Sequence, residues 1–566
     1  LTGVLFREFA FALATAVLIS GVVAVTLSPI MSARLAPAGG EETRFTKWVN
    51  ERFDTLRERY RAGLDRALAS SPQVLTLAVF FALLAVPFFL FSQKELAPTE
   101  DQGSVNVVIE SAPEGTVDYT TRHISTAVDF MNSLPGAADM WQIVYAEGGF
   151  GGQMLVPFDE RERSVHELLP QAFGGLSGVG GIKVFPVLPP PLPSAGNFDV
   201  ELVALSAESP EAMLGYAQQL VGEAMASGKF MFASTDLRID LPEGEFRLDR
   251  GRIADLGMTL DDVSRQLSVL LSGNYVNRFD YDGKAYQVIP MIERDGRPDP
   301  GALLELRIRT PGGDLVPLGA LATLEQRPAP RSLGKFQQKN SFRVYGGLIP
   351  GVTKEQGLAA LEAAALDVLP ADYTLDHAGE SRQLRQEGNT MIGVLGAALI
   401  VVFLVLAVQF NSFRDPLVVL LGSAPLALAG ALLIAFLDWT TINIYSQVGF
   451  VTLVGLVAKN AILIVEFANQ LRARGVEHAE AIREAATVRL RPVLMTTGAT
   501  VLGHFPLVLV SGPGAAARNS IGVVLVAGML IGTLFTLFVL PGVYMALAAR
   551  DRAKHAREAV AATAQG

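Results

Sequence analysis

Residues 442–472 read INIYSQVGFVTLVGLVAKNAILIVEFANQLR, an apolar run long enough to cross a bilayer, with Lys459 in its middle. A charged side chain at that depth costs about 2.5–3.5 kcal/mol on insertion scales. Such a lysine persists where it pairs with a carboxylate, faces a water-filled cavity or serves a function. The next residue, Asn460, is also polar. The rest of the chain should therefore show what Lys459 pairs with.

Six further apolar runs of spanning length lie on either side of this one. Together they predict a membrane α-helical bundle of seven spans, with the lysine-bearing span third from last. The predicted spans are Phe9–Leu27, Val74–Phe91, Thr390–Val408, Pro416–Phe436, Tyr445–Phe467, Pro492–Val510 and Ile521–Leu547. Half of the 566 residues are apolar, which suits several spans joined to a large aqueous domain. Glycines at positions 449, 455, 498, 528 and 532 should let the helices approach closely.

No window between Ser92 and Glu387 could span a bilayer, and short strand patterns there alternate with helical ones. Three units show the order strand, helix, strand: 104–111, 117–134 and 140–146; 198–205, 209–227 and 232–240; 340–348, 354–369 and 373–380. These repeats predict a large α+β domain of ferredoxin-like β-α-β units. The segment Glu245–Arg331 has its own helix and strands, and interrupts the units as an inserted subdomain.

The basic residues of the connectors fix the predicted orientation. Eight Lys and Arg lie between the first two spans and five follow the fifth, whereas LDWTT (437–441) has none. The basic connectors alternate onto one side, which is therefore cytoplasmic. The α+β domain should lie on the other side, outside the cytoplasm, and its lack of cysteine suits a periplasm. One connector contains the amphipathic pattern FTKWVNERFDTLRERYRAGLDRAL (45–68), typical of a helix on the membrane surface or, alternatively, packed on a bundle.

Composition excludes several kinds of function. A net charge of −10 argues against a nucleic-acid partner. The chain has no cysteine, so it has no disulfide, thiolate metal site or cysteine nucleophile, and none of its six histidines has metal-ligand spacing to another. No catalytic triad, paired-carboxylate pocket or nucleotide fingerprint stands out. We therefore expect no enzyme, no metal and no cofactor.

Three interpretations of Lys459 stay open at this point: a snorkelling side chain, a static buried ion pair, or an ion-coupled switch that alternately holds and releases a carboxylate. The spans of this chain are nearly free of Asp and Glu, and Glu466 lies two turns away near a basic connector. We therefore expect the acidic partner in a preceding segment. The start at Leu1, without Met and almost directly in an apolar run, likewise predicts a fragment.

Two further residues could join Lys459 and Asn460 in a polar relay. In VRLRPVLMTTGAT (488–500), Arg489 lies at the cytoplasmic entry of a span and Thr496 about one turn inside. Each residue also has a general explanation. Arg489 could reflect only the positive-inside bias, and the Thr496 hydroxyl could simply bond to a carbonyl of its own helix.

In the α+β domain, YAEGGFGGQM (145–154) predicts a flexible Gly-rich loop after a strand. Its side chains Tyr145, Phe150 and Met154 could contact bulky apolar ligands. The alternative is a mobile connector without such a role.

Several stretches together resemble one family, the resistance–nodulation–cell-division (RND) efflux transporters of the hydrophobe/amphiphile multidrug type, and the resemblance is to their C-terminal half. The matching stretches are ELAPTEDQG (95–103), SGNYVNRF (272–279), GLVAKNAILIVEFA (455–468), RLRPVLMTT (489–497) and SGPGAAARNSIG (511–522). The lysine-bearing span and the RLRP segment are the most specific of them.

The resemblance implies a homotrimer of twelve-span protomers with porter and docking regions. It implies drugs or other amphiphilic small molecules as substrates, a periplasmic adaptor and an outer-membrane channel as partners, and the proton gradient as driving force. Lys459, Arg489 and Thr496 resemble the family's relay residues, whereas its paired aspartates fall outside this chain. Tyr145–Met154 falls at the substrate-gating loop, but is shorter and has fewer phenylalanines.

The predicted division of the chain follows from the spans and from this resemblance. It comprises a span (1–30), a cytoplasmic link (31–73), a span (74–91), a porter subdomain (92–198), a second porter subdomain in two parts (199–244 and 332–388), a docking insertion (245–331), five spans (389–548) and a cytoplasmic tail (549–566).

The expected function is proton-driven efflux of drugs or amphiphiles toward an outer-membrane channel. A heavy-metal exporter of the same superfamily is one alternative, although the α+β domain shows no methionine cluster beyond Met140, Met154 and Met231. A non-transporting receptor or scaffold is another, and Lys459 argues against it because a sensor has no evident need of a charge at mid-membrane.

Overall fold

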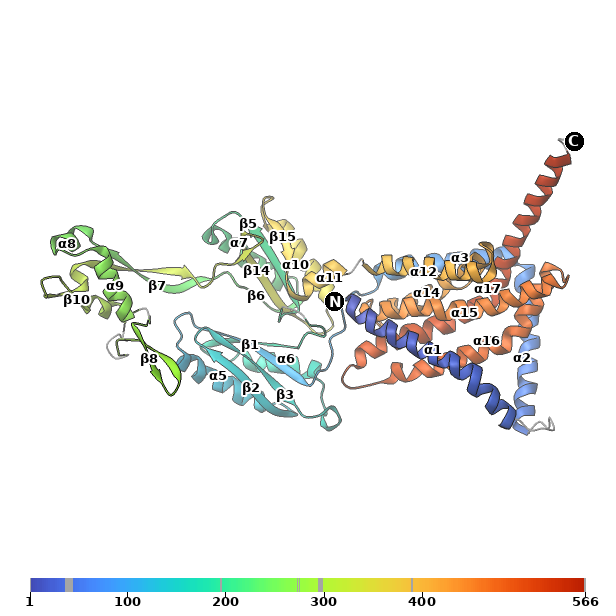
Figure 1. The fold of residues 1–566 in the computed structure, drawn as a ribbon, viewed down its shortest axis with the longest axis horizontal. Coiled ribbons are helices and arrows are strands. Elements are labelled where there is room, and N and C mark those ends of the chain that lie inside the picture. The colour runs from blue at the N-terminus through green and yellow to red at the C-terminus, as the bar shows by residue number, and fades with distance from the viewer. Residues whose placement is uncertain are drawn as a thin grey trace.

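The computed structural model describes residues 2–35, 44–193, 196–271, 273, 275–293, 299–387 and 390–563. Parts of the link at 36–43, positions 272 and 274 of the SGNYVNRF motif and the domain boundary at 388/389 lie outside the described residues. Figure 1 shows an elongated molecule with a helical bundle at one end and an extramembrane domain (residues 92–387) at the other. The mixed domain architecture expected from the sequence is therefore present.

Within the described ranges, seven helical segments are long and apolar enough to cross a membrane, as the hydropathy pattern predicts. They contain α1 (Thr2–Leu35), α3 and α4 (Ser71–Leu83 and Ala85–Phe91), α12 (Thr390–Phe410), α13 and α14 (Arg414–Leu421 and Ala424–Phe436), α15 (Ile444–Ala473), α16 (His478–Leu509) and α17 (Ala515–Thr563). The helix α1 has no buried residue in its most apolar window and runs apart from the packed helices (Figure 1).

The last three helices are longer than the predicted spans. The helix α16 begins at His478, well before the predicted start at Pro492, and α17 continues through most of the predicted tail. Ala481, Ala485 and Ala486 are buried in the added part of α16. A helix with an alanine-rich buried face continues beyond the apolar window because packing stabilises it there.

Three of the glycines singled out in the sequence set the spacing of the packed helices. A Cβ on Gly528 would lie 2.2 Å from Leu453, and one on Gly532 would lie 2.6 Å from Ala427. These contacts, and a similar one at Gly449, confirm close approach. At Gly455 and Gly498 a Cβ would meet open space, so the prediction is wrong for these two positions within the described chain.

The amphipathic pattern forms α2 (Arg44–Ala69), which crosses the end of the bundle far from the extramembrane domain (Figure 1). Its C-terminal half packs on the bundle, with Tyr60 and Leu64 buried and the Tyr60 hydroxyl donating to the Leu537 carbonyl at 2.8 Å. Its N-terminal half leaves Phe45 and Trp48 more than half exposed. Packing on the bundle is therefore confirmed for the C-terminal half, and a place on the membrane surface stays a prediction for the N-terminal half.

The first sheet of the extramembrane domain has the strand order β2-β3-β1-β4 and is antiparallel throughout. Its strands are β1 (Ser104–Ser111), β2 (Ala137–Tyr145), β3 (Gly148–Leu155) and β4 (Ile182–Val187). The helices α5 (Val117–Asn132) and α6 (Val165–Leu176) bury apolar residues such as Ile124 and Leu168 against it. A one-turn 3-10 helix, η1 (Phe158–Glu160), precedes α6.

The second sheet has the order β13-β14-β5-β15, with β6 also paired to β14. Its strands are β5 (Val200–Ser206), β6 (Phe230–Thr235), β13 (Lys335–Phe336), β14 (Lys339–Leu348) and β15 (Thr374–His377). The helices α7 (Pro210–Ala226) and α10 (Lys354–Val368) cover it, and α11 (Gly379–Glu387) leads toward the bundle. The predicted strands and helices of the three repeated units are confirmed.

The predicted insertion lies at the far end of the molecule, on a two-stranded ribbon of β7 (Ile239–Leu248) and β12 (Ala322–Pro330) (Figure 1). Beyond the ribbon lie α8 (Arg250–Asp255), α9 (Leu260–Leu271), the hairpin of β8 (Asn277–Tyr281) and β9 (Lys284–Val288), η3 (Pro300–Glu305), β10 (Arg307–Arg309), β11 (Leu315–Pro317) and η4 (Leu318–Ala320). Ile253, Val263 and Ile308 form its separate small core.

The ELAPTEDQG segment joins the extramembrane domain to the bundle. Lys94 forms a parallel β-bridge with Ile442, just before α15. The Thr441 hydroxyl donates to Glu95 at 2.6 Å, and Glu100 accepts the Ala517 N–H at 2.7 Å at the start of α17. One short segment therefore contacts the starts of two membrane helices.

Candidate functional site

The helix α15 begins with a capping box and carries Lys459 near its middle. Asn443 accepts the N–H groups of Tyr445 and Ser446, and the Ser446 hydroxyl accepts the Asn443 N–H. This cap satisfies donors that a helix start otherwise leaves unpaired. The helix then runs without a break to Ala473, so Lys459 lies within regular helical structure.

The Lys459 side chain points away from the packed core. Its neighbours Ala458 and Asn460 are buried, whereas Lys459 is exposed, as is Gly455 one turn earlier. Among the residues that the structure describes, Lys459 has no hydrogen bond or ion pair. The acidic partner of Lys459 in a preceding segment stays a prediction.

The nearest acidic side chains on the packed helices have other partners. Glu466 accepts a hydrogen bond from Gln470 on its own helix at 3.1 Å. Asp415, at the start of α13, accepts one from the Asn469 side chain at 3.0 Å, and the Asn469 side-chain amide oxygen accepts from the buried Tyr544 hydroxyl. Asp415, Asn469 and Tyr544 thus form a polar network separate from Lys459.

Asn460 lies at the centre of a buried polar cluster that joins α15, α16 and α17. Its amide nitrogen donates to the hydroxyls of Thr497 at 3.0 Å and Thr533 at 3.2 Å, which lie 3.1 Å from each other. Its amide oxygen accepts from Thr496 at 3.3 Å. The structure thus brings the predicted residues Asn460 and Thr496 together, one residue away from an exposed lysine.

Thr496 also follows the alternative interpretation, because its hydroxyl lies 3.0 Å from the Val493 carbonyl on its own helix. Thr533 was missed by sequence reasoning. Its only signal is a threonine next to Gly532 within the apolar run GMLIGTLFTLF (528–538). A hydroxyl in such a run back-bonds as readily as it bridges helices, so the pattern alone could not separate the two.

Arg489 does not join this cluster. Its guanidinium lies over the Phe467 ring, 4.6 Å from the centroid, and its buried Nε has no hydrogen-bond partner among the described residues. The predicted relay residues therefore fall into three groups. Asn460 and Thr496 are bonded to each other, Lys459 is exposed, and Arg489 lies nearer the start of α16 than Thr496 does.

The predicted Gly-rich loop is instead largely a strand, which corrects the sequence interpretation. Residues 148–155 form β3, an inner strand between β2 and β1, and only the hairpin turn before it is loop-like. A Cβ on Gly151 would lie 2.5 Å from the Trp141 carbonyl oxygen, and one on Gly152 would lie 2.7 Å from Asn106 Oδ1. The glycines serve close strand packing here, so their number indicates crowding and not flexibility.

The three candidate ligand-contacting side chains are accessible. Tyr145 and Met154 are exposed, and Phe150 is half-buried with its ring edge-on to Trp141 at 5.4 Å between centroids. Their role toward a substrate stays a prediction.

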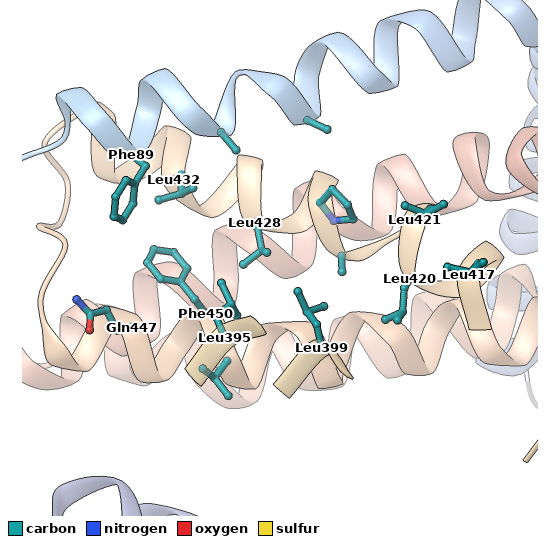
Figure 2. A pocket seen from close by; sticks show the side chains of 15 residues that line it. Phe89, Leu395, Leu399, Leu417, Leu420, Leu421, Leu428, Leu432, Gln447 and Phe450 are labelled. Carbon is teal, nitrogen blue, oxygen red and sulfur yellow. The ribbon is translucent and has the colours of Figure 1, made fainter. Parts of the chain in front are cut away.

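A second candidate region is an apolar cavity of about 470 Å³ inside the bundle (Figure 2). It is lined by α3, α4, α12, α13, α14 and α15. Phe89, Leu395, Leu428 and Phe450 point into it, and Gln447 at one end is the single polar residue among those that line it. A cavity of this size and apolar lining suits a drug-sized apolar molecule.

Comparison with known proteins gives a consistent assignment. A model described as the AcrB/AcrD/AcrF family matches residues 1–548. An uncharacterized transporter of Haemophilus influenzae is 36% identical over 98% of this chain. The multidrug/solvent efflux pump membrane transporter MepB of Pseudomonas putida and the multidrug export protein AcrF of Escherichia coli are each 29% identical, over 96% and 95% of the chain. The chain covers 54% of each of these relatives, about half of their length.

Proposed function

The chain belongs to the AcrB/AcrD/AcrF family of RND efflux transporters, and we propose that it carries one half of a proton/substrate antiporter that exports drugs or other amphiphilic compounds. The single observation that carries this proposal is Lys459, an exposed lysine at mid-helix beside a buried Asn–Thr cluster. Lys459 has no carboxylate partner among the described residues, and we propose that its partner belongs to the other half of the complete protein.

The proposed mechanism starts from the cost of an unpaired ammonium in the membrane. When a carboxylate from another segment of the protein is ionised, it pairs with Lys459, and that segment packs against the exposed face of α15. When that carboxylate takes up a proton, the attraction is lost and Lys459 turns toward other acceptors. Candidate acceptors are the oxygens of Asn460, the next residue on α15, and of Thr496, whose hydroxyl donates to Asn460 at 3.3 Å. Each protonation thus shifts α15 relative to its partner.

The apolar cavity supports amphiphiles as the substrate class. Its lining is almost wholly hydrocarbon, with Gln447 as the one group able to orient a polar head. A hydrated metal ion would lose its water there without gaining ligands, which disfavours metal export through this space. Tyr145, Phe150 and Met154 would contact the substrate later, on the extramembrane domain.

The assembly follows from the same family. We propose a homotrimer in the bacterial inner membrane, with twelve spans in each complete protomer and the domain 92–387 in the periplasm. The two sheets would be ferredoxin-like porter subdomains and the distal insertion a docking subdomain. A periplasmic adaptor and an outer-membrane channel would complete the export path.

The variant Lys459→Ala tests the coupling in the complete protein. Without the ammonium, the partner carboxylate can no longer form an ion pair that protonation breaks. We therefore expect export to be lost while expression and trimer formation are kept. Drug-dependent proton flux in proteoliposomes is the measurement. Met495→Ala, an exposed position on the neighbouring helix, is the control and should keep most of its activity. Wild-type flux in the Lys459→Ala variant would refute the proposal.

A further inference from the structure

A groove lies between the N-terminal half of α2 and the start of the apolar part of α16, at the end of the bundle opposite the extramembrane domain. Its volume is about 510 Å³, many times the ~30 Å³ share of one water molecule. Neither the apolar cavity nor the Asn–Thr cluster includes any of its residues. It is therefore a separate candidate site.

Three cations line the groove: Lys47, Arg57 and Arg491. Arg491 is held in place, because it donates to Asn50 at 3.1 Å and lies over the Phe53 ring, 4.5 Å from the centroid. A guanidinium has five N–H donors, so one bond to Asn50 leaves others for an anion. Lys47 has no hydrogen bond or ion pair among the described residues.

Two carboxylates line the same groove, which sets its chemistry apart from a plain basic patch. Asp54 lies 3.5 Å from Arg57, so this pair is largely neutralised. Glu51 is exposed and, in the part of the chain that the structure describes, its carboxylate has no partner. The groove thus offers an anion site at Lys47 and Arg491 and a separate cation site at Glu51.

An apolar stripe continues from the groove along α16. Four side chains at seven-residue steps lie on one face of this helix and are at least half exposed: Val488 (50%), Met495 (66%), Leu502 (72%) and Leu509 (68%). Val488 also lines the groove, so the stripe and the polar site are continuous. Trp48 on α2 is 55% exposed nearby, as is usual for side chains at the level of lipid headgroups.

We propose that this groove binds the headgroup of a zwitterionic phospholipid with a primary ammonium, such as phosphatidylethanolamine, with an acyl chain along the α16 stripe. Lys47 and Arg491 hold the phosphate, because ammonium and guanidinium groups make charge-assisted hydrogen bonds to phosphate oxygens. Glu51 accepts from the headgroup ammonium. A purely anionic headgroup would instead bring negative charge toward Glu51.

The groove shares α16 with the Asn–Thr cluster, because Arg491 and Thr496 both lie on this helix. Arg491 precedes Thr496 by five residues on α16, and α16 makes no break between them. A lipid bound at Arg491 would therefore hold both α2 and α16. The proposal does not depend on what the protein transports.

Native mass spectrometry of the complete protein with added lipids tests this. We expect phosphatidylethanolamine to be retained above phosphatidylglycerol and above phosphatidylcholine, whose quaternary ammonium cannot donate a hydrogen bond. Lys47→Gln should lower retention of all three about tenfold, since a hydrogen bond to a charged group contributes about 1.5–3 kcal/mol. Glu51→Gln should remove the preference over phosphatidylglycerol. Arg59→Gln, exposed on the same helix outside the groove, should change neither.

Three results would overturn the proposal. Phosphatidylglycerol retained as well as phosphatidylethanolamine by the wild-type protein would indicate unspecific attraction to acidic lipid. Equal losses in Lys47→Gln and Arg59→Gln would show that only the total charge of α2 matters. Displacement of the lipid by millimolar inorganic phosphate would assign the groove to a free anion.

Discussion

At the scale of single residues, Lys459 and Asn460 are neighbours on α15 with opposite surroundings, because the lysine side chain is exposed and the asparagine side chain is buried. Lys459 and Asn460 are conspicuous because the run around them is apolar, and the cost of a buried charge makes them functional candidates without any structure. Which of the two faces the core follows from the helix phase relative to its neighbours. That phase depends on contacts with α16 and α17, so only the structure separates the buried asparagine from the exposed lysine.

Thr533 gives a test of the buried cluster. Thr533→Val removes the hydroxyl that accepts from Asn460 and leaves part of a buried amide unpaired. We expect a loss of about 0.5–1.5 kcal/mol in the free energy of unfolding, since interhelical hydrogen bonds in membranes average about 0.6 kcal/mol. Thermal unfolding in detergent measures it.

Thr536→Val is the matched control, because Thr536 is equally buried on the same helix but donates only to the Gly532 carbonyl of that helix. Its effect should be smaller. Equal effects of the two variants would mean that the interhelical bonds add nothing.

At the scale of elements, the apolar pattern predicted the spans and the three repeated strand–helix–strand units, and it failed in the segment 148–155, where glycine was ambiguous. The segment 148–155 has four glycines and no strand-forming run, so turn chemistry favoured a loop. The glycines are needed because β3 lies between β1 and β2, and both neighbouring strands come close to its backbone. A pairing partner of this kind is not visible in the local pattern.

Gly151→Ala tests this reading of β3. The added Cβ would lie 2.5 Å from a backbone oxygen of β2, which cannot move without breaking the ladder. We expect the amides of β2 and β3 to lose protection from hydrogen exchange by about tenfold or more, as expected for a strain above 1.4 kcal/mol.

Gly174→Ala in α6 controls for the methyl group itself, because a Cβ there meets nothing within 4 Å. This variant should be neutral or slightly more stable, since alanine favours a helix by up to about 1 kcal/mol over glycine. Unchanged exchange in Gly151→Ala would show that β3 tolerates a side chain and is looser than a packed inner strand.

At the scale of the whole molecule, the segment that follows α4 is the physical link between bundle and extramembrane domain. Glu95 bonds Thr441 just before α15, and its charge also interacts with the buried Lys354 of α10. Lys354 in turn pairs with Glu380. A displacement of α15 driven at Lys459 would therefore reach the second sheet through few contacts. The sequence marked this segment only as a family motif, since Glu95 and Thr441 lie 346 residues apart.

Glu95 makes this junction sensitive to pH. Burial raises the pKa of its carboxyl above the ordinary value, although Thr441 and Lys354 act in the opposite direction. The folded state therefore binds a proton that the unfolded state has already released, between the ordinary and the raised pKa. Stability from this group is full below the ordinary pKa and is lost as pH rises through the raised one.

Glu95→Gln mimics the protonated form and should remove that loss. We expect the variant to match the wild-type protein in stability at pH values below the ordinary carboxyl pKa, and to exceed it increasingly toward neutral pH. Thermal unfolding at a series of pH values measures the difference. Asp240→Asn is the opposite control, because Arg331 lowers the pKa of that carboxyl and the variant should lose stability toward neutral pH. A Glu95→Gln variant that becomes less stable than the wild-type protein as pH rises would contradict this prediction. Such a result would show that the ionised carboxylate is needed to hold Lys354, and that ion pairs stabilise the junction more than burial of the charge destabilises it.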